Sequence, residues 1–131
     1  MIVVDASVLF EVVADTPRSR DLRTLLAAGE ALSAPHLIDA EVLAVIQTHL
    51  RRGHLDQTAA SQAVDDLRSW PGERWSHRLL MPRAWELRNN VRSYDALYVA
   101  LAEALDAPLV TLDARLAAAP GPLCRIIVAG Q

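Results

Sequence analysis

The chain has 131 residues, of which 52% are hydrophobic, one cysteine and a formal net charge of −3 at pH 7. This size and composition predict one globular domain over residues 1–131, and they exclude an internal disulfide and a metal cage made only of cysteines. The charge excludes the strongly basic profile of a protein held on nucleic acid by electrostatics alone. No apolar run reaches the roughly 18 residues of a membrane span, and the first residues lack the pattern of a signal peptide, so we expect a cytoplasmic protein with no membrane contact.

Short apolar runs alternate with helical patterns along the chain. Strands are predicted over residues 2–4, 31–34, 74–79, 108–111 and 125–128. Helices are predicted over residues 8–14, 18–28, 35–50, 55–70, 82–90 and 93–105, with Ser7 and Ser93 as N-caps and Pro35 in the first turn of the third helix. The short runs without polar alternation are typical of strands buried on both faces, and parallel strands need crossover connections. The pattern therefore predicts an α/β fold with a parallel sheet covered by helices.

Two aspartates lie where strands of such a sheet end. Asp5 follows the first strand, and Asp113 follows the fourth. Ligands of open parallel sheets bind beyond these carboxyl ends, and the helices that follow the strands begin on the same side. We therefore expect the helix starts that hold Glu41 and Asp95 to converge with the two aspartates. Taken alone, Asp95 is equally well explained as a first-turn acid that the helix dipole favours.

Glu41 is the unusual residue of the helix predicted over residues 35–50. Asp39 and Gln47 fall outside its apolar stripe and are interpreted as ordinary solvated positions. Glu41 interrupts that stripe, which consists of Leu37, Ile38, Val42, Val45 and Ile46. Acidic side chains are seldom buried unless they are paired or bind a metal ion, so this position favours a functional role for Glu41.

Four carboxylates in one cleft need a cation if all of them are to remain ionised. Ligands made only of oxygen favour Mg²⁺ or Mn²⁺ and argue against zinc. Such an ion polarises a phosphoryl group, activates a water molecule and stabilises the leaving oxygen. The acids therefore predict metal-dependent hydrolysis of nucleic acid. This chemistry does not distinguish the sugars, so a DNA nuclease remains an alternative to a ribonuclease.

Four segments, in their order and spacing, resemble the PIN-domain family, specifically the VapC-type toxins of bacterial toxin–antitoxin pairs. They read VVDASVLFEV, APHLIDAEVL, SYDALYVALAEAL and LVTLDARLA, and the resemblance spans essentially the whole chain. It implies a three-layer α/β/α fold with a short parallel sheet. It also implies an endoribonuclease that needs Mg²⁺ or Mn²⁺, cuts RNA and so inhibits translation and growth. A cognate VapB-type antitoxin would hold it in check, and the family suggests a homodimer.

The family's four acidic positions correspond to Asp5, Glu41, Asp95 and Asp113 in this sequence. Under this resemblance, all four are expected to be catalytic residues and metal ligands. Our hypothesis is that Asp5, Asp95 and Asp113 hold the metal ion directly. Glu41 would complete the ligand shell or position the attacking water.

Four further residues are candidates for substrate binding. Ser7 and Thr111 are expected to form hydrogen bonds with the carboxylates or with the substrate phosphate, with roles in helix capping or at a strand end as the alternative. Arg92 and Arg115 flank the predicted cleft and are candidates for binding RNA phosphates. Simple solvent exposure explains both arginines as well.

A binding module is the alternative from another functional class. It would keep the PIN-like fold and act by docking a partner peptide or by dimerising, with apolar surface from the helices before Pro35 and after Gly53. A metal-dependent phosphatase is less well supported, because Asp5-Ala6-Ser7 lacks the second acid of the common aspartyl-phosphate pattern. The histidines and tryptophans are interpreted as surface, core or interface residues: His36, His49, His54, His77, Trp70, Trp75 and Trp85.

Overall fold

The computed structural model describes residues 1–27 and 29–130. The strands in this part of the chain are β1 (Ile2–Val4), β2 (Leu32–Pro35), β3 (Glu73–Trp75), β4 (Leu109–Thr111) and β5 (Ile126–Val128). They form a sheet in the order β3-β2-β1-β4-β5, in which each neighbouring pair is parallel. The predicted α/β class and the short parallel sheet are confirmed.

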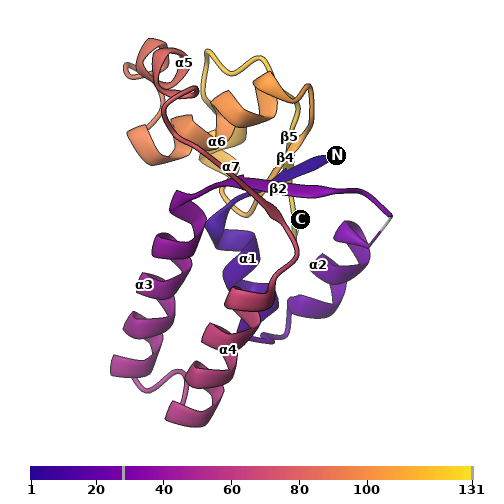
Figure 1. The fold of residues 1–131 in the computed structure, drawn as a ribbon, viewed down its shortest axis with the longest axis vertical. Helices are drawn as coiled ribbons and strands as arrows, with labels where there is room; N and C mark the ends of the chain where they lie inside the picture. The colour runs from indigo at the N-terminus through magenta and orange to yellow at the C-terminus, as the bar shows by residue number, and fades with distance from the viewer. Residues whose placement is uncertain (28, 131) are drawn as a thin grey trace.

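Helices cover both faces of this sheet. They are α1 (Ala6–Val13), α2 (Ser19–Leu26), α3 (Leu37–Arg51), α4 (Gln57–Ser69), α5 (Met81–Glu86), α6 (Ser93–Ala104) and α7 (Ala114–Ala118). Figure 1 shows α1 to α4 on one side of the sheet and α5 and α6 on the other, which gives the three layers α/β/α. Within the described residues, no helix has the length and apolarity needed to span a bilayer.

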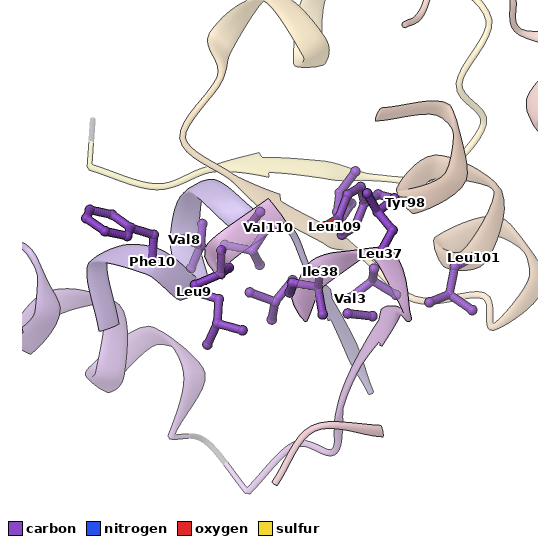
Figure 2. Packing of buried hydrophobic residues seen from close by; sticks show 14 of the residues in the cluster. Val3, Val8, Leu9, Phe10, Leu37, Ile38, Tyr98, Leu101, Leu109 and Val110 are labelled. Carbon is purple, nitrogen blue, oxygen red and sulfur yellow. The ribbon is translucent and has the colours of Figure 1, made fainter. Parts of the chain in front are cut away.

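The core lies between the sheet and these two layers of helices. Val3 of β1 and Val110 of β4 have no exposed surface, as expected for strands covered on both faces. Figure 2 shows them among buried side chains that include Leu9 of α1, Ile38 of α3 and Leu101 of α6. Because α6 is buried on most of its sides, its nearly uniform apolar sequence is explained by its position against the sheet.

Neither serine predicted as an N-cap has that role. Asp5 caps α1 instead, since its Oδ1 accepts a hydrogen bond from the Val8 N–H with an N···O distance of 3.2 Å. Helix α6 begins at Ser93 itself, and Arg92, which precedes it, makes no capping hydrogen bond through its side chain. For α1, Ser7 is not needed as a cap because the Asp5 carboxylate at the end of β1 already reaches the free N–H groups of the helix.

Pro35 ends β2, and the prediction that it lies in the first turn of a helix is wrong. It pairs with Trp75 of β3, which explains why α3 begins only at Leu37. The Leu37 N–H at the start of α3 donates to His77 Nε2 at 2.9 Å. His77 therefore satisfies a free N–H group of a helix that begins 40 residues earlier in the chain.

Several element ends differ from the prediction. Helix α2 ends at Leu26, and residue 28, the predicted end of this helix, lies outside the described residues. The predicted strand over residues 74–79 is limited to Glu73–Trp75, and the predicted helix over residues 82–90 corresponds to the shorter α5. Helix α4 begins later than predicted, because Asp56 caps it by accepting from the Ala59 N–H at 2.8 Å. Helix α7 was not predicted.

Candidate active site

A pocket of about 620 Å³ opens where β1 and β4 end. All four acids predicted from the sequence line it: Asp5, Glu41, Asp95 and Asp113. They come from four different elements, since Asp5 follows β1, Glu41 lies on α3, Asp95 lies in the first turn of α6 and Asp113 follows β4. The parallel sheet brings them to one place because its strand ends and the starts of the following helices share an edge.

Asp5 is buried, with 6% of its surface exposed, and hydroxyl groups hold both of its carboxylate oxygens. Ser7 Oγ donates to Oδ1 at 2.6 Å, and Thr111 Oγ1 donates to Oδ2 at 2.5 Å. The same hydroxyls accept hydrogen bonds from the backbone after β4, Ser7 from Leu112 N–H and Thr111 from Asp113 N–H, both at 3.1 Å. Ser7 and Thr111 therefore form hydrogen bonds with a carboxylate of the pocket, which is one of the roles expected for them from the sequence.

Glu41 is half-buried and receives a hydrogen bond from the opposite layer of helices. Tyr98 of α6 donates its hydroxyl hydrogen to Glu41 Oε1, with an O···O distance of 2.7 Å. Only 1% of the Tyr98 surface is exposed. Burial raises the pKa of the Tyr98 hydroxyl far above its usual range, and the hydrogen bond to Glu41 raises it further, so the phenol stays protonated and acts as donor.

Asp95 and Asp113 lie between the acidic pocket and a smaller pocket beside it. The smaller one has a volume of about 200 Å³, and Arg92 and Arg115 also line it. Asp113 caps α7 by accepting from the Arg115 N–H at 2.9 Å, and the Arg115 guanidinium lies 3.5 Å from the same carboxylate oxygen. Both predicted arginines therefore stand next to the acids, with the Arg115 side chain 82% exposed.

The acids make each other harder to ionise. Burial raises the pKa of Asp5 and of Glu41, and the negative charge of Asp95 adds to both shifts. Burial also raises the pKa of Asp95, and the charge of Asp113 contributes in the same direction. The positive charges of Arg92 and Arg115 oppose the shift of Asp95 only in part. A cation in the pocket would relieve this repulsion.

The donor atoms fit a hard divalent cation, since the acids offer carboxylate oxygens in a half-buried pocket whose electrostatics favour positive charge. Within residues 1–27 and 29–130, however, no three histidine, cysteine, aspartate or glutamate side chains are arranged to hold a metal ion as they stand. The acids therefore share a pocket without yet forming a closed ligand set. Their side chains would have to rotate to bring their oxygens onto one ion.

Several residues that line this pocket were not assigned to it from the sequence, among them Glu11, Phe10, His49 and Tyr98. Glu11 of α1 adds a fifth acid, one helical turn after Ser7. Phe10 and His49 line the part between α1 and α3, and their ring centroids lie 4.6 Å apart. The four-residue spacing from Ser7 is a signal for Glu11, because both then project from one helix face. No local signal identifies His49, whose position depends on how α3 packs against α1.

Comparison with known proteins agrees with this fold. The PIN domain model matches residues 2–122. Ribonuclease VapC1 of Mycobacterium tuberculosis is 42% identical over 125 residues, which cover 95% of this chain and 94% of that protein. The crystal structure of PAE2754 from Pyrobaculum aerophilum is 26% identical and covers 97% of this chain and 83% of that one, with a TM-score of 0.70.

A further solved structure shares the fold at lower identity. VapBC2 from Rickettsia felis, bound to a DNA fragment from its promoter, is 16% identical and has a TM-score of 0.67 over 96% of this chain and 98% of that one. Such a likeness shows the fold, while the family model and the identity to VapC1 extend over nearly the whole chain. This chain belongs to the PIN-domain family, within its branch of VapC ribonucleases.

Proposed function

We propose that this protein is the toxin of a VapBC-type toxin–antitoxin pair and that it hydrolyses RNA phosphodiester bonds as an endoribonuclease, inhibiting translation and growth. The observation that carries the proposal is the pocket in which four acids from four elements meet, in a chain 42% identical to a ribonuclease. Carboxylates that are hard to ionise together suit a site that works with a divalent cation.

VapC ribonucleases of the PIN-domain family depend on a metal ion, and we propose Mg²⁺ or Mn²⁺ for this chain. Asp5, Asp95 and Asp113 would hold it, and Glu41 would complete its shell or orient the attacking water. When bound, the cation polarises the phosphoryl group and stabilises the leaving oxygen. The protein's own part is to present carboxylates in a fixed orientation, which the hydroxyls of Ser7 and Thr111 do for Asp5.

Arg92 and Arg115 would bind RNA phosphates beside the acids. Both line the small pocket that adjoins Asp95 and Asp113, and guanidinium groups suit bidentate contacts with phosphate oxygens. They would also offset part of the repulsion between the acidic pocket and a polyanionic substrate.

We further propose a VapB-type antitoxin and a second copy of this chain as protein partners. The solved structure of VapBC2 from Rickettsia felis contains a chain with the same fold as this one. Support from this chain comes from large apolar side chains left exposed around α5, namely Leu79, Met81 and Trp85. The same surface favours an interaction module as the second candidate function, and the experiment below separates the two.

The test is replacement of Asp95 by asparagine, which keeps the shape of the side chain and removes its charge. Expression of the wild-type protein is expected to arrest growth and to create new RNA 5′ ends, whereas Asp95→Asn should do neither at equal protein levels. The matched control is Asp65→Asn, an exposed acid on α4, which should act like the wild type. Cleavage by Asp95→Asn at the wild-type rate would overturn the site assignment.

Two other outcomes separate the alternatives. Absence of both growth arrest and new RNA ends with the wild-type protein would favour the interaction module. Purified protein incubated with Mn²⁺ and either single-stranded RNA or DNA of the same sequence distinguishes the two nucleases, and we expect cleavage of the RNA alone.

A further inference from the structure

Tyr98 connects two of the acids that line the pocket. It lies on α6 three residues after Asp95, so both side chains project from the same face of the helix. From there its hydroxyl reaches Glu41 on α3, in the opposite layer of helices, with an O···O distance of 2.7 Å. Figure 2 shows Tyr98 on α6 among the buried side chains. Helix α6 thus carries Asp95 directly and holds Glu41 through Tyr98.

The way Glu41 is held differs from the way Asp5 is held. Asp5 accepts hydrogen bonds from two hydroxyls and one backbone N–H, which fix both of its oxygens. Across residues 1–27 and 29–130, the hydrogen bond from Tyr98 is the only one that Glu41 receives through its carboxylate. A glutamate side chain has three rotatable bonds. Because only one hydrogen bond holds the Glu41 carboxylate, its orientation depends on Tyr98.

A buried tyrosine hydroxyl needs a partner, and a backbone carbonyl would satisfy it equally well. Here the partner is Glu41, an acid of the pocket that lies on α3, in the layer of helices opposite α6. The contact occupies Oε1 and leaves Oε2 without a protein hydrogen bond among the described residues. That second oxygen is free for a cation or a water molecule.

We propose that Tyr98 is a positioning residue, which fixes the carboxylate of Glu41 so that its second oxygen serves the metal ion or the attacking water. The inference rests on the proposed function of this pocket and adds to it a residue outside the four acids. Tyr98 acts through Glu41 and does not touch the RNA. Its loss should therefore change the binding of the ion and the rate of the chemical step, and leave the binding of RNA unchanged.

The experiment uses the purified full-length chain with Tyr98→Phe, which keeps the buried ring and removes the hydroxyl. We expect the affinity for Mn²⁺, measured by titration calorimetry or electron paramagnetic resonance, to fall by about 10-fold, as for other groups that orient metal-binding side chains. We expect kcat for RNA to fall by a similar factor and KM to stay unchanged. Circular dichroism checks that the variant is folded.

The control for a packing defect is Ile46→Val, a core substitution on the same helix as Glu41 but outside the pocket. It should lower the melting temperature and leave Mn²⁺ affinity as in the wild type. If Tyr98→Phe folds poorly, Glu41→Asp breaks the same hydrogen bond from the pocket side by shortening the acid. An Mn²⁺ affinity of Tyr98→Phe equal to that of the wild type would overturn the proposal. If Glu41→Asp has to be measured in its place, an unchanged affinity of that variant would do the same.

A double-mutant cycle distinguishes positioning from an independent role. If Tyr98 acts only through Glu41, then Tyr98→Phe should have no further effect on Mn²⁺ affinity in a Glu41→Gln background. Additive losses would contradict the proposal. A wild-type protein that binds Mn²⁺ but cuts no RNA would overturn the nuclease function, while the affinity cycle still decides the role of Tyr98. A wild-type protein that binds no Mn²⁺ would overturn the proposal together with the metal site.

Discussion

Asp5 combines a structural and a chemical role in one carboxylate. It caps α1 through the Val8 N–H, and it lines the acidic pocket. Burial raises its pKa, and the hydrogen bonds from Ser7, Thr111 and Val8 oppose that shift because they stabilise the ionised form. A buried acid is tolerable at the end of β1 because three donors surround it. The same donors orient its oxygens for chemistry.

Arg92 and Arg115 lead to a prediction about RNA binding. If they bind phosphates, Arg92→Ala combined with Arg115→Ala should weaken RNA binding and make log K less dependent on log salt. For single-stranded RNA, the slope should become shallower by about 0.7 for each phosphate that the variant no longer neutralises. The measurement is fluorescence anisotropy over a series of salt concentrations, with a catalytically inactive Asp95→Asn background to prevent cleavage.

The matched control for these arginines is Arg20→Ala, since Arg20 is exposed on α2, away from both pockets. It should leave the affinity and the salt slope unchanged. An unchanged slope in the Arg92 and Arg115 variant would show that both side chains are merely solvated.

At the scale of elements, Arg74 of β3 joins α3 to the end of α4. Its guanidinium donates to both carboxylate oxygens of Asp39, at 3.1 and 2.8 Å, and to the carbonyls of Leu67, Trp70 and Gly72. Asp39, predicted as an ordinary solvated residue, keeps 44% of its side chain exposed but is paired with Arg74. Because α3 carries Glu41, this contact also fixes the helix that brings one acid to the pocket.

We expect Arg74→Lys to lower the free energy of unfolding by about 2 kcal/mol, because a lysine ammonium cannot replace the bidentate contact and the carbonyl contacts together. Urea unfolding followed by circular dichroism measures the change. The control is Arg78→Lys, an exposed position three residues after β3, which should change the stability by less than about 0.5 kcal/mol. If Arg74→Lys lowers the free energy of unfolding no more than the control does, Arg74 does not join α3 to α4 as proposed.

For the whole molecule, the acids of the pocket oppose folding when they ionise. A carboxyl group with a raised folded-state pKa stabilises the fold below its unfolded pKa, and this contribution is lost as pH rises through the folded pKa. Asp5, Glu41 and Asp95 all shift in this direction. Without metal, Asp95→Asn should therefore melt at a higher temperature than the wild type at neutral pH. Below the ordinary aspartate pKa of about 3.9, the difference should disappear.

A divalent cation should raise the melting temperature of the wild type above that of Asp95→Asn, because the cation binds the folded state of the wild type. Mn²⁺ at 100 times its Kd would stabilise the wild type by about 2.7 kcal/mol, and a chelator would remove the gain. Asp95→Asn should gain much less. Differential scanning fluorimetry at several pH values, with and without Mn²⁺, measures both effects. A wild type that melts above Asp95→Asn at neutral pH without metal would refute the repulsion between the acids.

Much of the fold and of the candidate site follows from local features of the sequence. Continuous apolar runs such as Ile2–Val4 identify strands buried on both faces, and the predicted strands and helices follow the order of the structure except for the unpredicted α7. The order of strand ends and helix starts was enough to predict that Asp5, Glu41, Asp95 and Asp113 meet at one edge. The single domain over residues 1–131 and the homodimer stay predictions.

Only the tertiary structure decided which partner each polar side chain has. Tyr98 and Glu41 are 57 residues apart in the chain, and Arg74 and Asp39 are 35 apart. A sequence pattern reports the face of a helix on which a side chain lies, because the helical period is local. Which group that face meets depends on how whole helices pack against the sheet, and this packing joins distant segments through contacts that no local period encodes.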